Sequence, residues 1–181
     1  MRIPDRTTLE GFTAYAAHTD VLLTAPTNAE FECMTAAAVA ADAVRRRNYL
    51  ANPPMVMSPV VRTLSAELNK LVEANAFRAP GEKVHLGFQG IAGIGKTKAI
   101  QHAAKVIWNN ERSKHGEVVK IGQVRSPRVP VLYSTAPAVR SYKELIGSPL
   151  RYFDARATGN AEAMTEQLLH LLHIAETEVV V

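Results

Sequence analysis

The sequence predicts an α/β fold in which a partial parallel sheet follows an N-terminal helical region. Residues 1–78 are rich in helix-forming side chains. Three short apolar runs, at 84–89, 129–135 and 177–181, have the length and composition of buried strands. Helical segments with one apolar face separate these runs, as in a chain of alternating strands and helices. We therefore expect two parts, a helical region at 1–78 and an α/β domain at 79–181.

The composition predicts a core-forming protein of one globular domain. The chain has 181 residues, of which 47% are hydrophobic and 21% charged. Its first ten residues lack the apolar stretch of a signal peptide, and the longest near-apolar run is too short to span a membrane. A single cysteine, Cys33, cannot form an internal disulfide, which fits a cytoplasmic protein. We expect Cys33 to be a small buried side chain rather than a catalytic thiol.

Start and stop signals divide the helical region. Residues 7–50 are predicted to be helical, and Thr27-Asn28 has the composition of a helix N-cap. The arginines at 45–47 favour the negative end of that helix, although contact with a nucleic acid is an alternative. Ser58-Pro59 begins a second amphipathic helix that is predicted to end near Asn75.

The α/β part is punctuated by turn signals. The first is Ala79-Pro80-Gly81, just before the strand expected at 84–89. A helix is expected from the end of a glycine-rich loop to about Asn110, and residues 111–127 are expected to form a long connection. Ser148-Pro149 is expected to interrupt the segment that follows the second strand. A last core-facing helix is marked by Met164, Leu168, Leu171, Leu172 and Ala175.

One motif carries chemistry, and it lies in the glycine-rich loop. Eight successive residues satisfy the phosphate-loop pattern G-x-x-x-x-G-K-[ST], and Lys98 follows them in the first helical turn. The eight are Gly90, Ile91, Ala92, Gly93, Ile94, Gly95, Lys96 and Thr97.

Each position of the motif has a chemical reason. Gly90 and Gly95 permit backbone angles and a close approach that a Cβ atom would block. Backbone N–H groups of the loop and the helix start converge on phosphate oxygens. Lys96 neutralises the β- and γ-phosphates, and the Thr97 hydroxyl ligates Mg²⁺. The sequence therefore predicts a site for a nucleotide, with ATP and Mg²⁺ as cofactors, although no base-reading motif separates ATP from GTP.

A basic segment follows the motif. Residues 96–128 contain eight lysines and arginines and two glutamates, a net charge of +6. Such a segment can meet a phosphate backbone. The alternative is an ordinary solvated helix face and loop, with Lys96 already committed to the nucleotide.

The order of these elements resembles AAA+ ATPases of the TniB/TnsC type, the nucleotide-binding proteins of bacterial transposition systems. The helix SPVVRTLSAELNKLVEAN comes first, and GFQGIAGIGKTKAI, VPVLYSTAPA, a leucine-rich helix and TEVVV follow. The resemblance covers roughly residues 55–181 and implies an AAA+-like P-loop NTPase fold. It also implies ATP-dependent assembly into a homo-oligomer on DNA and contact with a transposase.

The chain departs from that family at Val181. The Walker B carboxylates would begin there, and the sensor strand, the arginine finger and the helical lid would follow. We therefore expect an amino-terminal portion that binds ATP but turns it over little or not at all. Two other functions stay open: a small-molecule kinase with Arg140, Arg151 and Arg156 as lid residues, and a regulator that binds a nucleotide without hydrolysing it.

Overall fold

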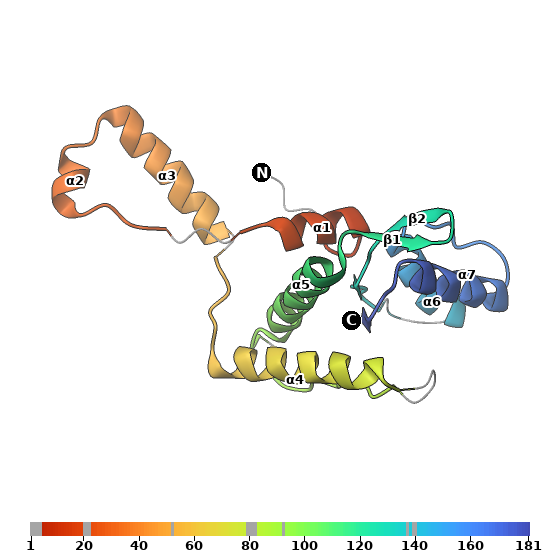
Figure 1. Ribbon diagram of the computed structural model, residues 1–181. Helices are drawn as coiled ribbons and strands as arrows, with labels where there is room; N and C mark the ends of the chain where they lie inside the picture. Colours follow the sequence, from red (N-terminus) through yellow and green to blue (C-terminus); the bar gives the residue numbers. More distant parts are fainter. Residues whose placement is uncertain are drawn as a thin grey trace. The chain divides into compact units, whose positions relative to one another are not determined.

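The computed structural model is mostly helical (Figure 1). It describes residues 5–19, 23–51, 53–78, 83–91, 93–136, 138 and 141–181. Several predicted features therefore lie outside the described residues: the turn at 79–81, Ala92 of the glycine-rich loop, and Arg140. The helices and strands are α1 (Leu9–Ala17), α2 (Asn28–Glu32), α3 (Ala36–Ala51), α4 (Pro59–Ala76), α5 (Lys96–His115), β1 (Val118–Ile121), β2 (Val124–Pro127), β3 (Val131–Leu132), α6 (Tyr142–Tyr152), α7 (Ala161–Ile174) and β4 (Val179–Val180).

The chain forms two compact units, one of which is Thr19–Met57. In this unit the predicted N-cap at Thr27 is confirmed, because its hydroxyl accepts from the Glu30 N–H and the Glu30 carboxylate accepts from the Thr27 N–H. The helix then ends at Glu32. Cys33 caps this end and is exposed, so its predicted burial is wrong. No residue of α2 is buried, so there is no core here to receive the thiol.

The arginines of α3 do not act at the helix end as predicted. The side chains of Arg45 and Arg46 both donate to the buried carboxylate of Asp42, one turn back on the same helix. Arg45 also donates to the carbonyl oxygen of Thr24, 3.2 Å away. A buried carboxylate requires partners of opposite charge, and that requirement decides where these side chains lie.

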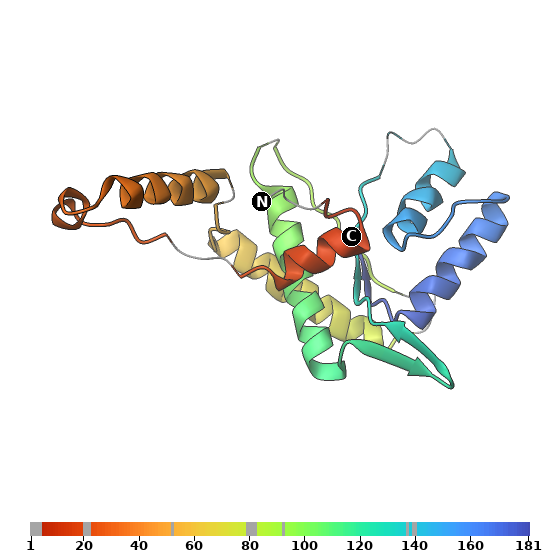
Figure 2. The same ribbon diagram turned by 90° about the horizontal axis from the view of Figure 1, so that it is seen from above.

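The other unit combines the chain up to His18 with Ser58–Val181. Its α5 packs against both α4 and α1, and Figure 2 shows α5 crossing α4. As predicted, Ser58 caps α4 and Pro59 occupies its first turn, while Val61, Leu64 and Leu68 form the buried face.

The core of this unit is aromatic. Phe12 of α1 is fully buried, with its ring centroid 5.3 Å from that of Trp108 and 5.9 Å from that of Tyr133. Tyr152 of α6 lies on another side of Phe12, at 6.5 Å, and its hydroxyl donates to the Val131 carbonyl oxygen of β3. These contacts fix α1, α5, β3 and α6 around one centre, with the glycine-rich loop at the start of α5.

Two predicted irregular segments are regular, and those predictions are wrong. Residues 111–127 are not a connection: α5 continues to His115, and β1 and β2 then form an antiparallel hairpin. Helix α6 runs through Pro149, which therefore does not interrupt it. Leu150 and Tyr152 are buried beyond the proline, and their packing outweighs the one hydrogen bond that proline removes.

The predicted sheet is only partly present. Strands β3 and β4 pair in parallel, Val131 with Val179 and Leu132 with Val180, so the runs at 129–135 and 177–181 each contain a strand, as predicted. Residues 84–89 are extended but form no strand, and Val84, Leu86 and Phe88 are each about two-fifths exposed.

The predicted fold class, an α/β AAA+-like P-loop NTPase with a partial parallel sheet, is therefore wrong. The described residues contain two separate sheets of two strands each, and one of them is antiparallel. An apolar run becomes a strand only where another strand offers hydrogen bonds to its backbone, and residues 84–89 have no such neighbour in the described chain. None of the helices in the described residues is long and apolar enough to cross a membrane.

Candidate phosphate-binding loop

The glycine-rich loop leads directly into the longest described helix, α5. Gly95 is the N-cap of this helix, with φ of +87°, and Gly93 has φ of +83°. Both values lie in the left-handed region that favours glycine. The requirement predicted for Gly95 is confirmed, whereas the requirement at Gly93 was missed. Gly90 is not left-handed, and an added Cβ there would meet only the Lys96 and Ile94 side chains, at 3.6 and 3.9 Å.

Lys96 folds back over the loop that precedes it. Its Nζ donates to the carbonyl oxygens of Gly90 and Ile91, both 2.6 Å away. The ammonium group is thereby held against the first residues of the loop, five and six positions before Lys96. Such charge-assisted bonds fix the position of a long side chain that would otherwise sample many rotamers.

The start of α5 offers further donors. No side chain caps this end, and the first intrahelical bond runs from the Ala99 N–H to the Gly95 carbonyl oxygen at 2.9 Å. The N–H groups of the first turn therefore have no partner within the helix. The aligned peptide dipoles of twenty residues add partial positive charge at the same place. Lysine and backbone donors thus converge where an anion can bind.

The remaining residues of the predicted site are exposed. Thr97 and Lys98 lie at the surface in the first turn of α5. Ile91 and Ile94 are 81% and 71% exposed, far more than isoleucines of a packed loop. Ala92 lies outside the described residues. The described residues of the loop are therefore largely open to solvent.

The metal prediction depends on Thr97. Its hydroxyl is exposed and adjacent to Lys96, as a ligand for a phosphate-bound Mg²⁺ must be. In the described part of the chain, no three histidine, cysteine, aspartate or glutamate side chains gather into a metal-binding group. The residues at hand thus fit the phosphate part of a nucleotide better than they fit a metal held by protein alone.

Sequence reasoning missed one residue that positions the loop. Asn75, in the last turn of α4, donates from its side-chain amide to the Val84 carbonyl oxygen at 3.0 Å and accepts from the Val84 N–H at 2.9 Å. Lys83 also donates to the Asn75 carbonyl oxygen. These bonds tie the extended segment before the loop to α4. An asparagine near a helix end is an ordinary stop signal, so the sequence pattern did not predict the contact of Asn75 with Val84.

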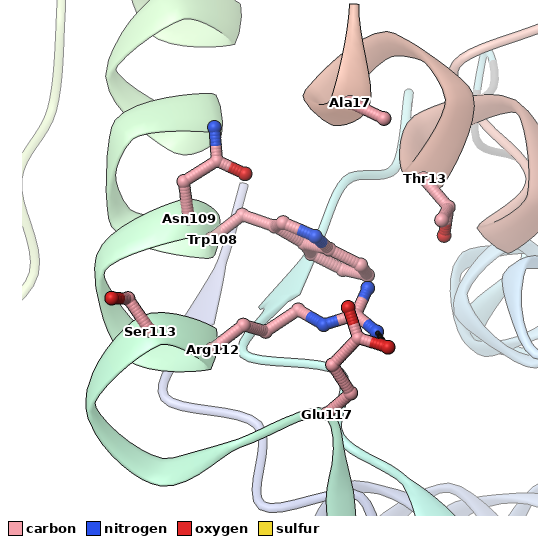
Figure 3. Close-up of a pocket in the computed structure, with 7 residues that line it drawn as sticks. All are labelled: Thr13, Ala17, Trp108, Asn109, Arg112, Ser113 and Glu117. Carbon is pink, nitrogen blue, oxygen red and sulfur yellow. Dashed lines mark ion pairs between the residues drawn. The ribbon is translucent and has the colours of Figure 1, made fainter.

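A pocket of about 450 Å³ lies near the other end of α5 (Figure 3). Its lining is Thr13, Ala17, Trp108, Asn109, Arg112, Ser113 and Glu117. The Arg112 guanidinium lies 5.3 Å from the centroid of the Trp108 ring and forms an ion pair with Glu117 at 3.3 Å. The two charges of this pocket oppose each other, so it attracts neither anions nor cations strongly. The loop is the better candidate for a phosphate site.

Comparisons of the chain with protein-family models, curated proteins and solved structures give no match. The assignment of a function therefore depends on the loop itself.

Proposed function

We propose that the loop at 90–97 binds the phosphates of ATP together with Mg²⁺. The observation that supports this most is the position of Lys96, whose Nζ is 2.6 Å from two loop carbonyl oxygens at the uncapped start of α5. A motif match alone would allow any glycine-rich turn before a helix. Here the motif's lysine lies against the loop itself, so its positive charge is placed where the phosphates would bind.

Binding would proceed by exchange of partners. The Lys96 ammonium group would move from neutral carbonyl oxygens to phosphate oxygens, which accept stronger charge-assisted bonds. The N–H groups of the first turn of α5 would take further oxygens, and Thr97 would share the Mg²⁺ that bridges them. The left-handed glycines leave the backbone free of Cβ atoms on the approach.

The test compares two lysine variants of one helix. Lys96→Ala should abolish Mg-ATP binding measured by calorimetry, while Lys114→Ala, at the other end of α5, should bind as the wild type does. At a hundredfold excess over the dissociation constant, Mg-ATP should stabilise the wild type by about 2.7 kcal/mol. Equal stabilisation of the wild type and Lys96→Ala by Mg-ATP would reject the proposal.

A location in the cytoplasm is part of this proposal, since ATP is abundant there and the exposed Cys33 would stay reduced. A role in DNA transposition, with a transposase as partner and assembly into a homo-oligomer, stays a prediction. The choice between ATP and GTP is settled by the same calorimetry with both nucleotides.

A further inference from the structure

The hairpin of β1 and β2 presents two like charges side by side. Lys120 and Arg125 are directly opposite each other in the antiparallel register. Val119, the preceding residue of β1, is 2% exposed, so its face of the hairpin points into the protein and the Lys120 face points outward. Two cations in this arrangement repel each other and destabilise the hairpin.

Nearby acids do not relieve this repulsion. Glu111 pairs with Lys114, and Glu117 pairs with Arg112. No ion pair in the described residues includes Lys120 or Arg125. The stretch from 112 to 128 has five basic side chains and one acidic side chain, a net charge of +4. An anionic partner would relieve the repulsion between these two exposed cations.

The outward face of the hairpin carries both cations and no acidic side chain. Val118 and Pro127 are paired two positions away from the two cations, on the same face, and both are exposed. Gly122, with φ of +59°, closes the hairpin in a two-residue turn, so the tip is narrow. Figure 2 shows this tip projecting past the C-terminal end of α5.

We propose that this outward face, defined by Val118, Lys120, Arg125 and Pro127, binds the phosphate backbone of duplex DNA. A two-stranded ribbon fits the major groove of B-form DNA, which is about 12 Å wide. The major groove of A-form RNA is too narrow for it. Phosphates of the duplex backbone would neutralise Lys120 and Arg125 and release the counterions condensed on the DNA.

The experiment measures binding of a labelled DNA duplex of arbitrary sequence by fluorescence anisotropy, between about 50 and 200 mM salt. Lys120→Gln/Arg125→Gln should weaken binding and reduce the magnitude of the slope of log affinity against log salt by about 1.8. Each phosphate contact contributes about 0.9 to this slope, and the double variant removes two. Lys70→Gln/Lys143→Gln removes the same charge elsewhere and should keep the wild-type slope. An equal loss in both double variants would overturn the proposal, because net charge alone would then explain binding.

A third variant separates binding from stability. Lys120→Glu places a carboxylate opposite Arg125, so the melting temperature should rise while DNA binding falls further than in Lys120→Gln. A fall in both quantities would show that Lys120 is structural and would overturn the proposal.

Equal affinity for a duplex RNA of the same sequence would overturn the assignment to the DNA major groove. Lys96→Ala should bind DNA as the wild type does, since the hairpin acts without the nucleotide site.

Discussion

The side chain of Asn75 bonds both backbone polar groups of Val84, at 3.0 Å to the carbonyl oxygen and 2.9 Å from the N–H. The amide imitates the pairing that a neighbouring strand would give to this one residue. It holds the first residue of the extended segment before the phosphate loop. Beyond it, the segment is exposed at Leu86 and Phe88.

We expect Asn75→Ala to release this segment. Each bond contributes about 0.5–1.5 kcal/mol to stability, less where it is exposed to water. The Val84 amide should therefore exchange its hydrogen faster in the variant, as measured by native-state hydrogen exchange. Asn69→Ala, on the same helix, is the control and should be neutral or slightly stabilising, because alanine is the better helix former. Unchanged exchange at Val84 would contradict the clamp.

The segment at 84–89 shows why the sheet could not be predicted from the sequence. Its alternating valine, leucine and phenylalanine match a strand, and that is a local property. Pairing is not local, since it depends on where other strands lie. The caps at Thr27 and Ser58 were predicted correctly because each depends on residues three or fewer positions away.

We expect Tyr152→Phe to destabilise the protein by about 1–3 kcal/mol, measured by urea unfolding. The tyrosine hydroxyl donates to the Val131 carbonyl oxygen at 3.0 Å, both residues are buried, and the variant leaves that carbonyl without a donor. Tyr142→Phe, at an exposed position of α6, should cost almost nothing. Equal stability of the two variants would contradict this account.

Burial also raises the pKa of Tyr152 above its ordinary value near 10. The folded state therefore holds the proton more tightly than the unfolded state does. The contribution of Tyr152 to stability should be constant below pH 10 and should fall as the pH rises further and the unfolded phenol ionises. In Tyr152→Phe most of this decline in stability at high pH should be absent. A decline of unchanged size would show that Tyr152 does not cause it.

A second pH effect belongs to the unit at 19–57. Hydrogen bonds from Arg45 and then from Arg46 lower the pKa of the Asp42 carboxyl below its ordinary 3.8. The contribution of this carboxyl to stability is therefore present at pH values above its pKa in the unfolded state. It is lost as the pH falls through its pKa in the folded state. The helicity of α3 should therefore decrease in acid, measured by circular dichroism. Asp42→Asn should flatten this dependence, while Glu32→Gln, an exposed control, should leave it in place.

The sequence of residues 118–127 contains a hairpin signal that the prediction of a long connection did not use. Two short runs that begin with valine, VVKI and VRSP, flank Gly122-Gln123, and a glycine in a two-residue connection between such runs is typical of a hairpin. The basic charges of this stretch favoured a loop instead. Helix α6 shows the opposite case, since Pro149 is a correct local signal that the packing of Leu150 overrides.

The glycines of the loop allow a last prediction that separates ligand binding from folding. Gly95 has φ of +87°, and Gly95→Ala should destabilise the free protein by about 1–2 kcal/mol because a left-handed backbone is strained for alanine. Gly90 lacks this geometry, and a Cβ there would make only ordinary contacts. Gly90→Ala should therefore leave the free protein as stable as the wild type, or stabilise it by about 0.4–1 kcal/mol because alanine lowers the conformational entropy of the unfolded chain. The same Cβ should nevertheless weaken Mg-ATP binding, because it occupies space beside the Lys96 side chain where phosphate would approach. Urea unfolding and calorimetry on both variants provide the measurement. If Gly90→Ala binds Mg-ATP as tightly as the wild type does, the loop is a helix-capping turn and phosphate does not approach at Gly90.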